Sequence, residues 1–526
     1  MWCGHAARRD DDVAQDPTPG MTDETPDPPS TVGRSDLRSA TLSSARWVAL
    51  GRGSSQTVAF VALVAVSHLV PPSAVAHAAI ALLVTQLAST LSTFGFGARV
   101  VREKELDRRE TGLSLLLSWA VGITAGLITV VVSVVALRPI FGPEVEHLVQ
   151  LAAVAFPISA LAAVPMGLLE RQLAFRAIST IESAGYILGP LSSVGLAAAG
   201  LNASALVIGQ LVTLGVISAA VLVMAPAVKP AWANPRRILQ YGIPATFSGI
   251  LYILYSNIDY ALLGARLPAT QVGYYVRAYQ LGSDYQSKIS GIMLRVALPV
   301  FSRAKDTADL REIRMRITRV HATVLLPLLF LLMGTAPQTV PFRLGSAWRG
   351  AVLPTQILTV GGMVGAVGTG TGPLLLAMGR ATTALVYNAA VVVVYAIGIW
   401  LAAPYGIVTV SVVAVAIRML GLATLLRGII QPLVGIPASD TVTRDIAPAA
   451  VSAVPLLAIA FGGTWAIGHW HLAPAPSLAV IFVLALTAYA ATLRALFKSS
   501  WADAMQLVPS KLRQRPRAAA RVGSPA

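Results

Sequence analysis

Apolar runs of about 20 residues recur along most of the chain, separated by short polar breaks. A run of that length crosses roughly 30 Å of hydrocarbon as a helix, and a helix satisfies its own backbone hydrogen bonds there. Fourteen such runs are present. The predicted membrane-spanning helices are 47–69, 75–97, 112–137, 147–168, 178–199, 203–224, 241–265, 273–298, 320–342, 351–377, 381–402, 406–430, 447–468 and 474–497.

Composition agrees with this pattern. Of the 526 residues, 55% are hydrophobic and 12% are charged, and the mean hydropathy is +0.69. These values are typical of a membrane protein and lie far from those of soluble globular proteins. The sequence therefore predicts an all-α polytopic membrane protein with about 14 transmembrane helices.

The first 44 residues differ from the rest of the chain. They hold eight acidic residues, many prolines and no apolar run, which predicts a disordered tail over 1–44. No cleavable signal peptide is recognisable, and Met21 is an alternative start. The single cysteine, Cys3, lies in this tail, which excludes an internal disulfide framework and a thiolate metal site.

The net charge of +16 would by itself suggest nucleic acid as a partner, but the cations cluster in alternate loops. With a cytoplasmic amino terminus, the outer loops hold only Arg138, Arg266, Arg343 and Arg349. By the positive-inside rule both ends of the chain are then cytoplasmic, and nucleic acid is not expected. The basic tail over 498–526 could also contact anionic membrane lipids.

The outer loops are short, which leaves no room for an extracellular catalytic domain. The chain contains no Gly-Lys dipeptide and so no Walker A loop. The glycine-rich stretch 368–372 lies inside a predicted helix, where small residues permit a close helix contact or a kink. We expect a protein that is not an enzyme and that holds no cofactor or metal.

A short internal repeat suggests how the helices are grouped. The turn from Leu69 to His77 and the turn from Arg266 to Tyr274 share a Pro, a Val, a small residue and a ring at the same spacing. Each turn follows the first helix of a block of six. We predict two parallel six-helix lobes facing a central cavity, over 45–225 and 226–432, followed by two further helices over 433–497.

The predicted eighth helix carries four charged residues, Arg277, Asp284, Lys288 and Arg295. At 100° per residue they fall within about 20° of one direction, so they form one stripe about 27 Å long. Ionisable groups at this depth cost several kcal/mol if they face lipid, so the stripe should face protein or water. Two interpretations remain: internal pairing, with Asp284 and Lys288 one turn apart, or a ladder that lines a functional cavity.

Further polar residues lie on the helices predicted to face that cavity. They are Arg52, Gln56, Asn257 and Asp259. Together with the stripe they give four cations against two acids, which suits an anionic cargo such as a phosphate or diphosphate. The predicted substrate-binding residues are Arg52, Gln56, Asn257, Asp259, Arg277, Asp284, Lys288 and Arg295.

Several segments of this chain resemble those of a known family. They are LLERQLAFRAISTIE (168–182), NIDYALLGARLPATQVGYYVRAYQL (257–281), LPVFSR (298–303), GSAWRGAV (345–352) and AMGRATT (377–383). In order and spacing they resemble the Wzx-type polysaccharide and oligosaccharide flippases, relatives of the MATE exporters and the lipid II flippases. The likeness covers residues 45–435, although the turn LVPPSAVAHAAIAL lacks that family's acidic and glycine residues.

The resemblance implies two MATE-like, pseudo-symmetric lobes that alternate access and move a polyprenyl-diphosphate-linked oligosaccharide to the outer leaflet of a bacterial cell membrane. A gradient of H⁺ or Na⁺ could supply the energy, with Asp259 or Asp284 as the candidate ion site. A polysaccharide polymerase or glycosyltransferases are the implied partners.

Two alternatives stay open. A lipid II flippase would use a similar cationic lumen, and a MATE-like exporter of organic cations would present acids in its cavity.

Overall fold

The structure is a computed structural model, and it describes residues 53–92, 96–97, 100–101, 107–236, 250, 253, 257–284, 286–287, 290, 301, 306–378 and 380–505. All of the regular structure over these residues is helical. Nine helical stretches within them are long and apolar enough to cross a bilayer. The prediction of an all-α polytopic membrane protein is confirmed.

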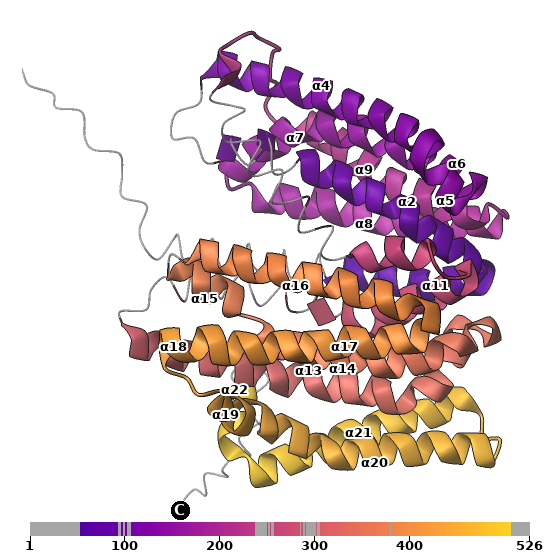
Figure 1. Cartoon of the computed structure of the whole chain (residues 1–526), viewed down its shortest axis with the longest axis vertical. Helices are drawn as coiled ribbons and strands as arrows, with labels where there is room; N and C mark the ends of the chain where they lie inside the picture. Colours follow the sequence, from indigo (N-terminus) through magenta and orange to yellow (C-terminus); the bar gives the residue numbers. More distant parts are fainter. Residues whose placement is uncertain are drawn as a thin grey trace, which may run out of the picture. The chain divides into compact units, whose positions relative to one another are not determined.

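The first half of the described chain forms one series of helices (Figure 1). These are Gly53–Leu69, α2 (Pro72–Ser92), α4 (Arg108–Val132), η2 (Ser133–Leu137), α5 (Arg138–Phe141), α6 (Pro143–Ala153), α7 (Ala155–Arg171), α8 (Phe175–Ala198) and α9 (Asn202–Met224). Helices α4, η2 and α5 are continuous, and short breaks separate the others; at Gly142, for example, φ is +84°, a value that suits glycine. These helices agree with the first six predicted spans.

The second half begins with a helix over 257–264. It continues with α11 (Ala269–Tyr279), η3 (Gln280–Asp284), α13 (Thr307–Leu344), η4 (Ser346–Ala351), α14 (Val352–Gly368), α15 (Thr371–Ala377), α16 (Ala381–Ala402), η5 (Ala403–Tyr405), α17 (Ile407–Leu425), η6 (Leu426–Ile430) and α18 (Gln431–Val434). The predicted seventh and eighth spans lie partly outside the described residues. The other predicted spans of this half each coincide with helix.

A final group of helices closes the described chain. It comprises α19 (Ala438–Asp440), η7 (Thr441–Ile446), α20 (Ala447–His469), α21 (Pro474–Leu496) and α22 (Lys498–Met505). Figure 1 shows α20 and α21 running side by side, and α20 packs along α13. The two predicted carboxyl-terminal spans are therefore present. The predicted boundaries between lobes stay a prediction.

The predicted tenth span is not one helix. Helix α14 ends at Gly368 and α15 begins at Thr371. Between them Gly370 has φ +90°, in the left-handed region that residues with a Cβ rarely adopt. The glycine-rich stretch therefore breaks the helix, in agreement with the kink considered from the sequence.

The predicted eighth helix also departs from regular geometry. Its residues Gln280–Asp284 form the π-helix η3, whose turns are wider than those of an α-helix. A wheel drawn at 100° per residue therefore does not hold between Arg277 and Asp284. Lys288 and Arg295 lie outside the described residues, so a single stripe through all four charged residues stays a prediction.

The two turns that carry the sequence repeat meet in the structure. Helices α2 and α11 pack along each other, and Gly273 lies on the backbone carbonyl of Pro72. A Cβ at Gly273 would overlap that carbonyl, so glycine is needed for this approach. One continuous core of buried apolar residues follows from this contact, and it includes Ala78 of α2 and Tyr275 of α11.

Candidate functional site

Arg277 is the predicted site residue that the structure places most clearly. Its side chain is 4% exposed and projects from α11. One terminal nitrogen donates to Gln280 Oε1 at 2.9 Å, and the guanidinium carbon lies 5.5 Å from the centre of the Trp348 ring. An arginine buried this deeply is costly unless its surroundings are polar or hydrated.

Arg277 lines a cavity whose other walls come from the first half of the chain. This Arg277 cavity has a volume of about 170 Å³ and lies against Gly53–Leu69, α2, α8 and α9. Its other polar lining residues are Ser193, Gln210 and Thr213. A cation from the predicted second lobe thus lines a space formed by helices of the predicted first lobe.

Asn257 joins the same two sets of helices. Its amide nitrogen donates to Gln86 Oε1 on α2 at 3.2 Å and to the Ile253 carbonyl at 3.1 Å. Gln56, by contrast, is exposed on Gly53–Leu69 and is not among the residues that line the Arg277 cavity. The structure therefore brings Asn257 and Arg277 to the contact between halves and leaves Gln56 apart from them.

Asp259 is fully enclosed, with 1% of its surface exposed. One carboxylate oxygen accepts from the backbone N–H of Tyr260 at 3.0 Å. The other accepts from the hydroxyls of Tyr275 at 2.9 Å and Tyr395 at 3.1 Å. These bonds satisfy a buried charge, which would otherwise be strongly destabilising.

The remaining predicted residues are less informative. Asp284 is half-buried at the end of η3. Arg52, Lys288 and Arg295 lie outside the described residues. The proposed ladder along the eighth helix is therefore represented in the structure by its first two members.

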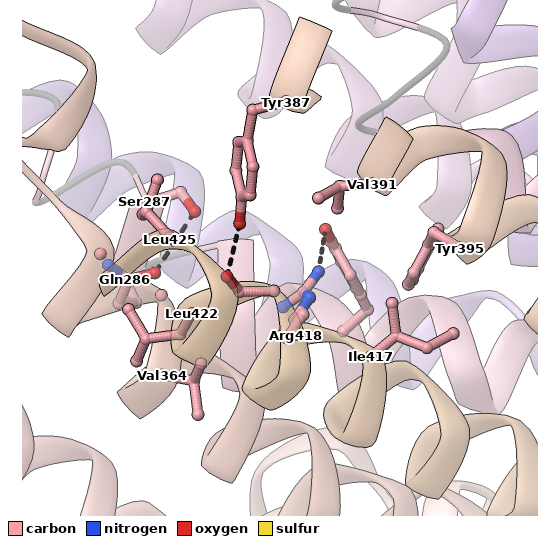
Figure 2. A pocket seen from close by; sticks show the side chains of 14 residues that line it. Gln286, Ser287, Val364, Tyr387, Val391, Tyr395, Ile417, Arg418, Leu422 and Leu425 are labelled. Carbon is pink, nitrogen blue, oxygen red and sulfur yellow. Dashed lines mark hydrogen bonds between the residues drawn. The ribbon is translucent and has the colours of Figure 1, made fainter. Parts of the chain in front are cut away.

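A larger cavity lies between α11, α14, α16 and α17, and Figure 2 shows its lining. This Arg418 cavity has a volume of about 300 Å³. Arg418 extends from α17 and donates to Tyr279 hydroxyl at 2.9 Å and to Ser283 Oγ at 3.1 Å. Arg418 is not among the predicted site residues. The available signal was a lone arginine within the apolar run 407–425.

A third cavity, of about 280 Å³, lies among helices of the first half. Two carboxylates line it, from Glu170 on α7 and Glu182 on α8. The buried hydroxyl of Ser159 also lines it. Both glutamates lie within the segment LLERQLAFRAISTIE, yet neither was among the predicted site residues.

A metal site would need several ligands that converge. Within the part of the chain that the structure describes, no group of three His, Cys, Asp or Glu side chains is placed to hold a metal ion.

Residues 65–353 match the family described as polysaccharide biosynthesis protein. The chain belongs to this family. The match spans more than half of the chain and includes α2, α11 and Arg277, so it contains the contact between the two repeat turns. Arg418 lies beyond it.

Curated relatives of this polysaccharide biosynthesis protein cover a similar share. It is 24% identical over 363 residues to the lipopolysaccharide biosynthesis protein WzxC of Escherichia coli (strain K12), covering 67% of this chain and 73% of WzxC. It is 25% identical over 332 residues to the teichuronic acid biosynthesis protein TuaB of Bacillus subtilis (strain 168), covering 61% of this chain and 68% of TuaB. The resemblance to Wzx-type proteins is confirmed.

Solved transporters share the fold. The lipid II flippase MurJ in an inward closed conformation matches with a TM-score of 0.67 and 10% identity, over 86% of this chain and 98% of that one. An inward-facing multidrug resistance MATE transporter matches with a TM-score of 0.57 and 17% identity, over 70% and 92%. At these identities the likeness concerns the fold, and the expectation of a MATE-like fold is confirmed.

Proposed function

We propose that this polysaccharide biosynthesis protein is a flippase that moves a lipid-linked saccharide across the membrane. The observation that carries the proposal is Arg277, a buried cation that lines a cavity between helices of both halves. The guanidinium of Arg277 can bind two oxygen atoms of a diphosphate in this cavity.

The proposed cargo is a polyprenyl-diphosphate-linked oligosaccharide. In this mechanism the diphosphate contacts Arg277, the sugars occupy the polar interior, and the lipid tail stays in the bilayer. Arg52, Lys288 and Arg295 are proposed as further contacts for the diphosphate. The two lobes then rock about the packed contact between α2 and α11, which exposes the head group on the other side.

We propose that the protein lies in a bacterial inner membrane with both termini in the cytoplasm, because its cations cluster in alternate loops. Transport then runs from the cytoplasmic to the outer leaflet. A polysaccharide polymerase or glycosyltransferases would act on the exported product. The relatives WzxC and TuaB, named for lipopolysaccharide and teichuronic acid biosynthesis, support such a role.

A coupling ion, H⁺ or Na⁺, is proposed as the energy source. Asp284 is the better candidate site, because it is half-buried while Asp259 is enclosed and already accepts three hydrogen bonds. Exchange of an ion at Asp259 would require both tyrosine hydroxyls to release their bonds to its carboxylate.

One observation favours a second candidate function, the export of organic cations. The cavity lined by Glu170 and Glu182 offers carboxylates, which attract cations. The lipid-linked saccharide remains the first choice because of the family to which the chain belongs.

The test is a flux assay in liposomes that contain the purified protein and a fluorescent polyprenyl-diphosphate oligosaccharide. The label's accessibility at the far leaflet is followed over time. We expect the wild type to move the label and Arg277→Gln to lose at least about 90% of the rate, since the variant keeps hydrogen-bonding capacity but loses the charge. Arg349→Gln, an exposed arginine on η4, serves as the matched control.

Movement of an organic cation against a proton gradient, with no movement of any lipid-linked saccharide, would replace the flippase by an exporter. Equal rates for Arg277→Gln and Arg349→Gln would remove Arg277 from the transport path. Both variants are first compared with the wild type in thermal unfolding, so that a folding defect is recognised.

A further inference from the structure

The Arg418 cavity has no part in the proposed path of the diphosphate. Its lining comes from α11 and the residues that follow it, α14, α16 and α17, and it shares no lining residue with the Arg277 cavity. Figure 2 shows Arg418 pointing between Tyr387, Val391 and Tyr395, which come from α16. It is therefore a second polar space in the helices of the second half.

Arg418 is held in a fixed orientation. Its two terminal nitrogens donate to neutral hydroxyls, those of Ser283 and Tyr279, and its guanidinium carbon lies 5.2 Å from the centre of the Tyr279 ring. Both of these partners are neutral hydroxyls, and Arg418 is also attracted to the carboxylate of Asp259. Tyr395 lines the cavity and donates a hydrogen bond from its hydroxyl to the carboxylate of Asp259, which does not line the cavity.

Aromatic rings form another wall of the cavity. Tyr387, Val391 and Tyr395 follow one another at intervals of four residues on α16, so they share one face. The Tyr387 hydroxyl donates to the Gly421 carbonyl and the Tyr395 hydroxyl to Asp259, so both hydroxyls are turned into the protein. A ligand in the cavity would therefore contact the faces of the tyrosine rings. The apolar faces of sugar rings pack on aromatic rings in this way.

Polar groups and glycines complete the lining. Gln286 and Ser287 line the cavity with an amide and a hydroxyl, which bond to Ser290 and to the Ser283 carbonyl and would have to exchange these bonds for sugar hydroxyls. Gly365 and Gly368 lie one turn apart on α14 and leave the space open; a Cβ at Gly368 would meet only Leu422, at 3.8 Å. The volume of about 300 Å³ lies at the small end of the range for ligand pockets.

We propose that the Arg418 cavity is a saccharide subsite that takes a sugar unit carrying an anionic group, a carboxylate or a phosphate. Arg418 binds the anionic group, the tyrosine rings pack on the sugar face, and Gln286 and Ser287 bind hydroxyls. The inference rests on the proposed function for its physiological cargo. In this proposal the subsite selects among head groups. The diphosphate cannot give such selectivity, because all these cargoes carry it.

The test is a binding measurement that needs no transport. Detergent-solubilised full-length protein is titrated with glucuronic acid, glucose 1-phosphate and glucose, and binding is followed by ligand-observed NMR. We expect one of the two anionic sugars to bind about tenfold more tightly than glucose, because a charge-assisted hydrogen bond is roughly twice as strong as a neutral one. The preferred probe distinguishes carboxylate from phosphate.

Two variants locate the binding. Arg418→Gln should bind all three probes equally, whereas Arg427→Gln, an exposed arginine on η6, should behave as the wild type. Gly368→Leu leaves Arg418 in place and fills the cavity, so it should lose all binding. Gly368→Leu keeps the test valid if Arg418→Gln fails to fold.

Three results would overturn the subsite: no binding of any probe to the wild type, equal binding of glucose and both anionic sugars, or unchanged discrimination in Arg418→Gln and Gly368→Leu. The flippase proposal is tested separately, because Arg277→Gln should lose flux and keep the binding of free sugars. A protein that binds anionic sugars but moves no lipid-linked saccharide would retain the subsite and lose the flippase.

Discussion

The hydroxyl of Tyr395 donates a hydrogen bond to the carboxylate of Asp259 at 3.1 Å, while the same side chain lines the cavity that contains Arg418. One tyrosine thus contacts a buried acid, Asp259, and lines the cavity of a half-buried arginine, Arg418. Tyr275 donates to the same oxygen from α11 at 2.9 Å. The arrangement ties the helix over 257–264, α11 and α16 together around a single carboxylate.

This geometry predicts that Asp259 is needed for stability. Asp259→Asn removes the charge that accepts both tyrosine hydroxyls, and we expect it to lower the free energy of unfolding by about 1–3 kcal/mol. The midpoint of thermal unfolding in detergent measures the effect. Asp306→Asn is the matched control, because Asp306 is an exposed helix cap and asparagine caps a helix equally well. Equal midpoints for the two variants would contradict a structural role for Asp259.

The contact between the two repeat turns gives a second prediction. Gly273→Ala places a Cβ against the Pro72 carbonyl, where the structure has no room. Overpacking of this kind costs about 1–3 kcal/mol. Gly215→Ala on α9 is the comparison, because nothing lies within 4 Å of a Cβ there. The yield of folded protein and the unfolding midpoint should fall for Gly273→Ala alone, and a fall of the same size for both would refute the packing argument.

A third prediction concerns how η7 and α22 are held on α13. Arg319 binds Asp445 and Asp503 at 3.2 Å each, and Asp445 is fully buried. Arg319→Ala would remove the cation that is hydrogen-bonded to this buried carboxylate and leave only its attraction to Arg314, at a cost of about 3–5 kcal/mol. Arg444→Ala removes an exposed arginine 3.9 Å from Asp440 and should cost less than about 1 kcal/mol.

Thermal unfolding compares these two arginine variants. Arg319→Ala combined with Asp445→Ala should recover little of the loss, because the buried Arg314, which is attracted to Asp445, then loses that carboxylate. If Arg319→Ala and Arg444→Ala are equally stable, the ion pairs of Arg319 do not hold the carboxyl-terminal helices in place.

The sequence predicts the helices well because hydropathy over some 20 residues is a strong local signal. It predicts Arg277 because a charge inside such a run needs a polar environment. Arg418 is likewise a charge inside an apolar run, and it lines the larger cavity. Glu170 and Glu182 are not predicted as site residues, because acids near the ends of predicted helices resemble ordinary loop residues.

Other features depend on contacts that no local pattern records. The π-helix η3 lies where Gly282 packs on the backbone at Thr359 of α14, a residue distant in the sequence. The direction of each side chain beyond that point depends on this local geometry. Likewise, Asp259 looks like a lumen residue in the sequence, and only the folded arrangement of Tyr275 and Tyr395 shows that it is enclosed.

A last prediction concerns the bond between Trp348 and Ser67. Trp348 Nε1 donates to the Ser67 carbonyl at 2.8 Å, joining η4 to Gly53–Leu69 and thus the two predicted lobes. Trp348→Phe keeps an aromatic ring but removes the donor, at a cost of about 1 kcal/mol. If rocking of the lobes separates these elements, the population of the separated state should rise about fivefold.

That population can be measured in a protein that carries Ser67→Cys and Cys3→Ser. A maleimide alkylates the introduced cysteine only in the separated state, because Ser67 is buried in the joined state. Trp348→Phe should raise the rate about fivefold, in proportion to the population of the separated state. Trp465→Phe, which changes an exposed tryptophan on α20, should leave it unchanged. An unchanged rate in Trp348→Phe would mean that these two elements stay together throughout the cycle, as expected if they lie at the rocking axis itself.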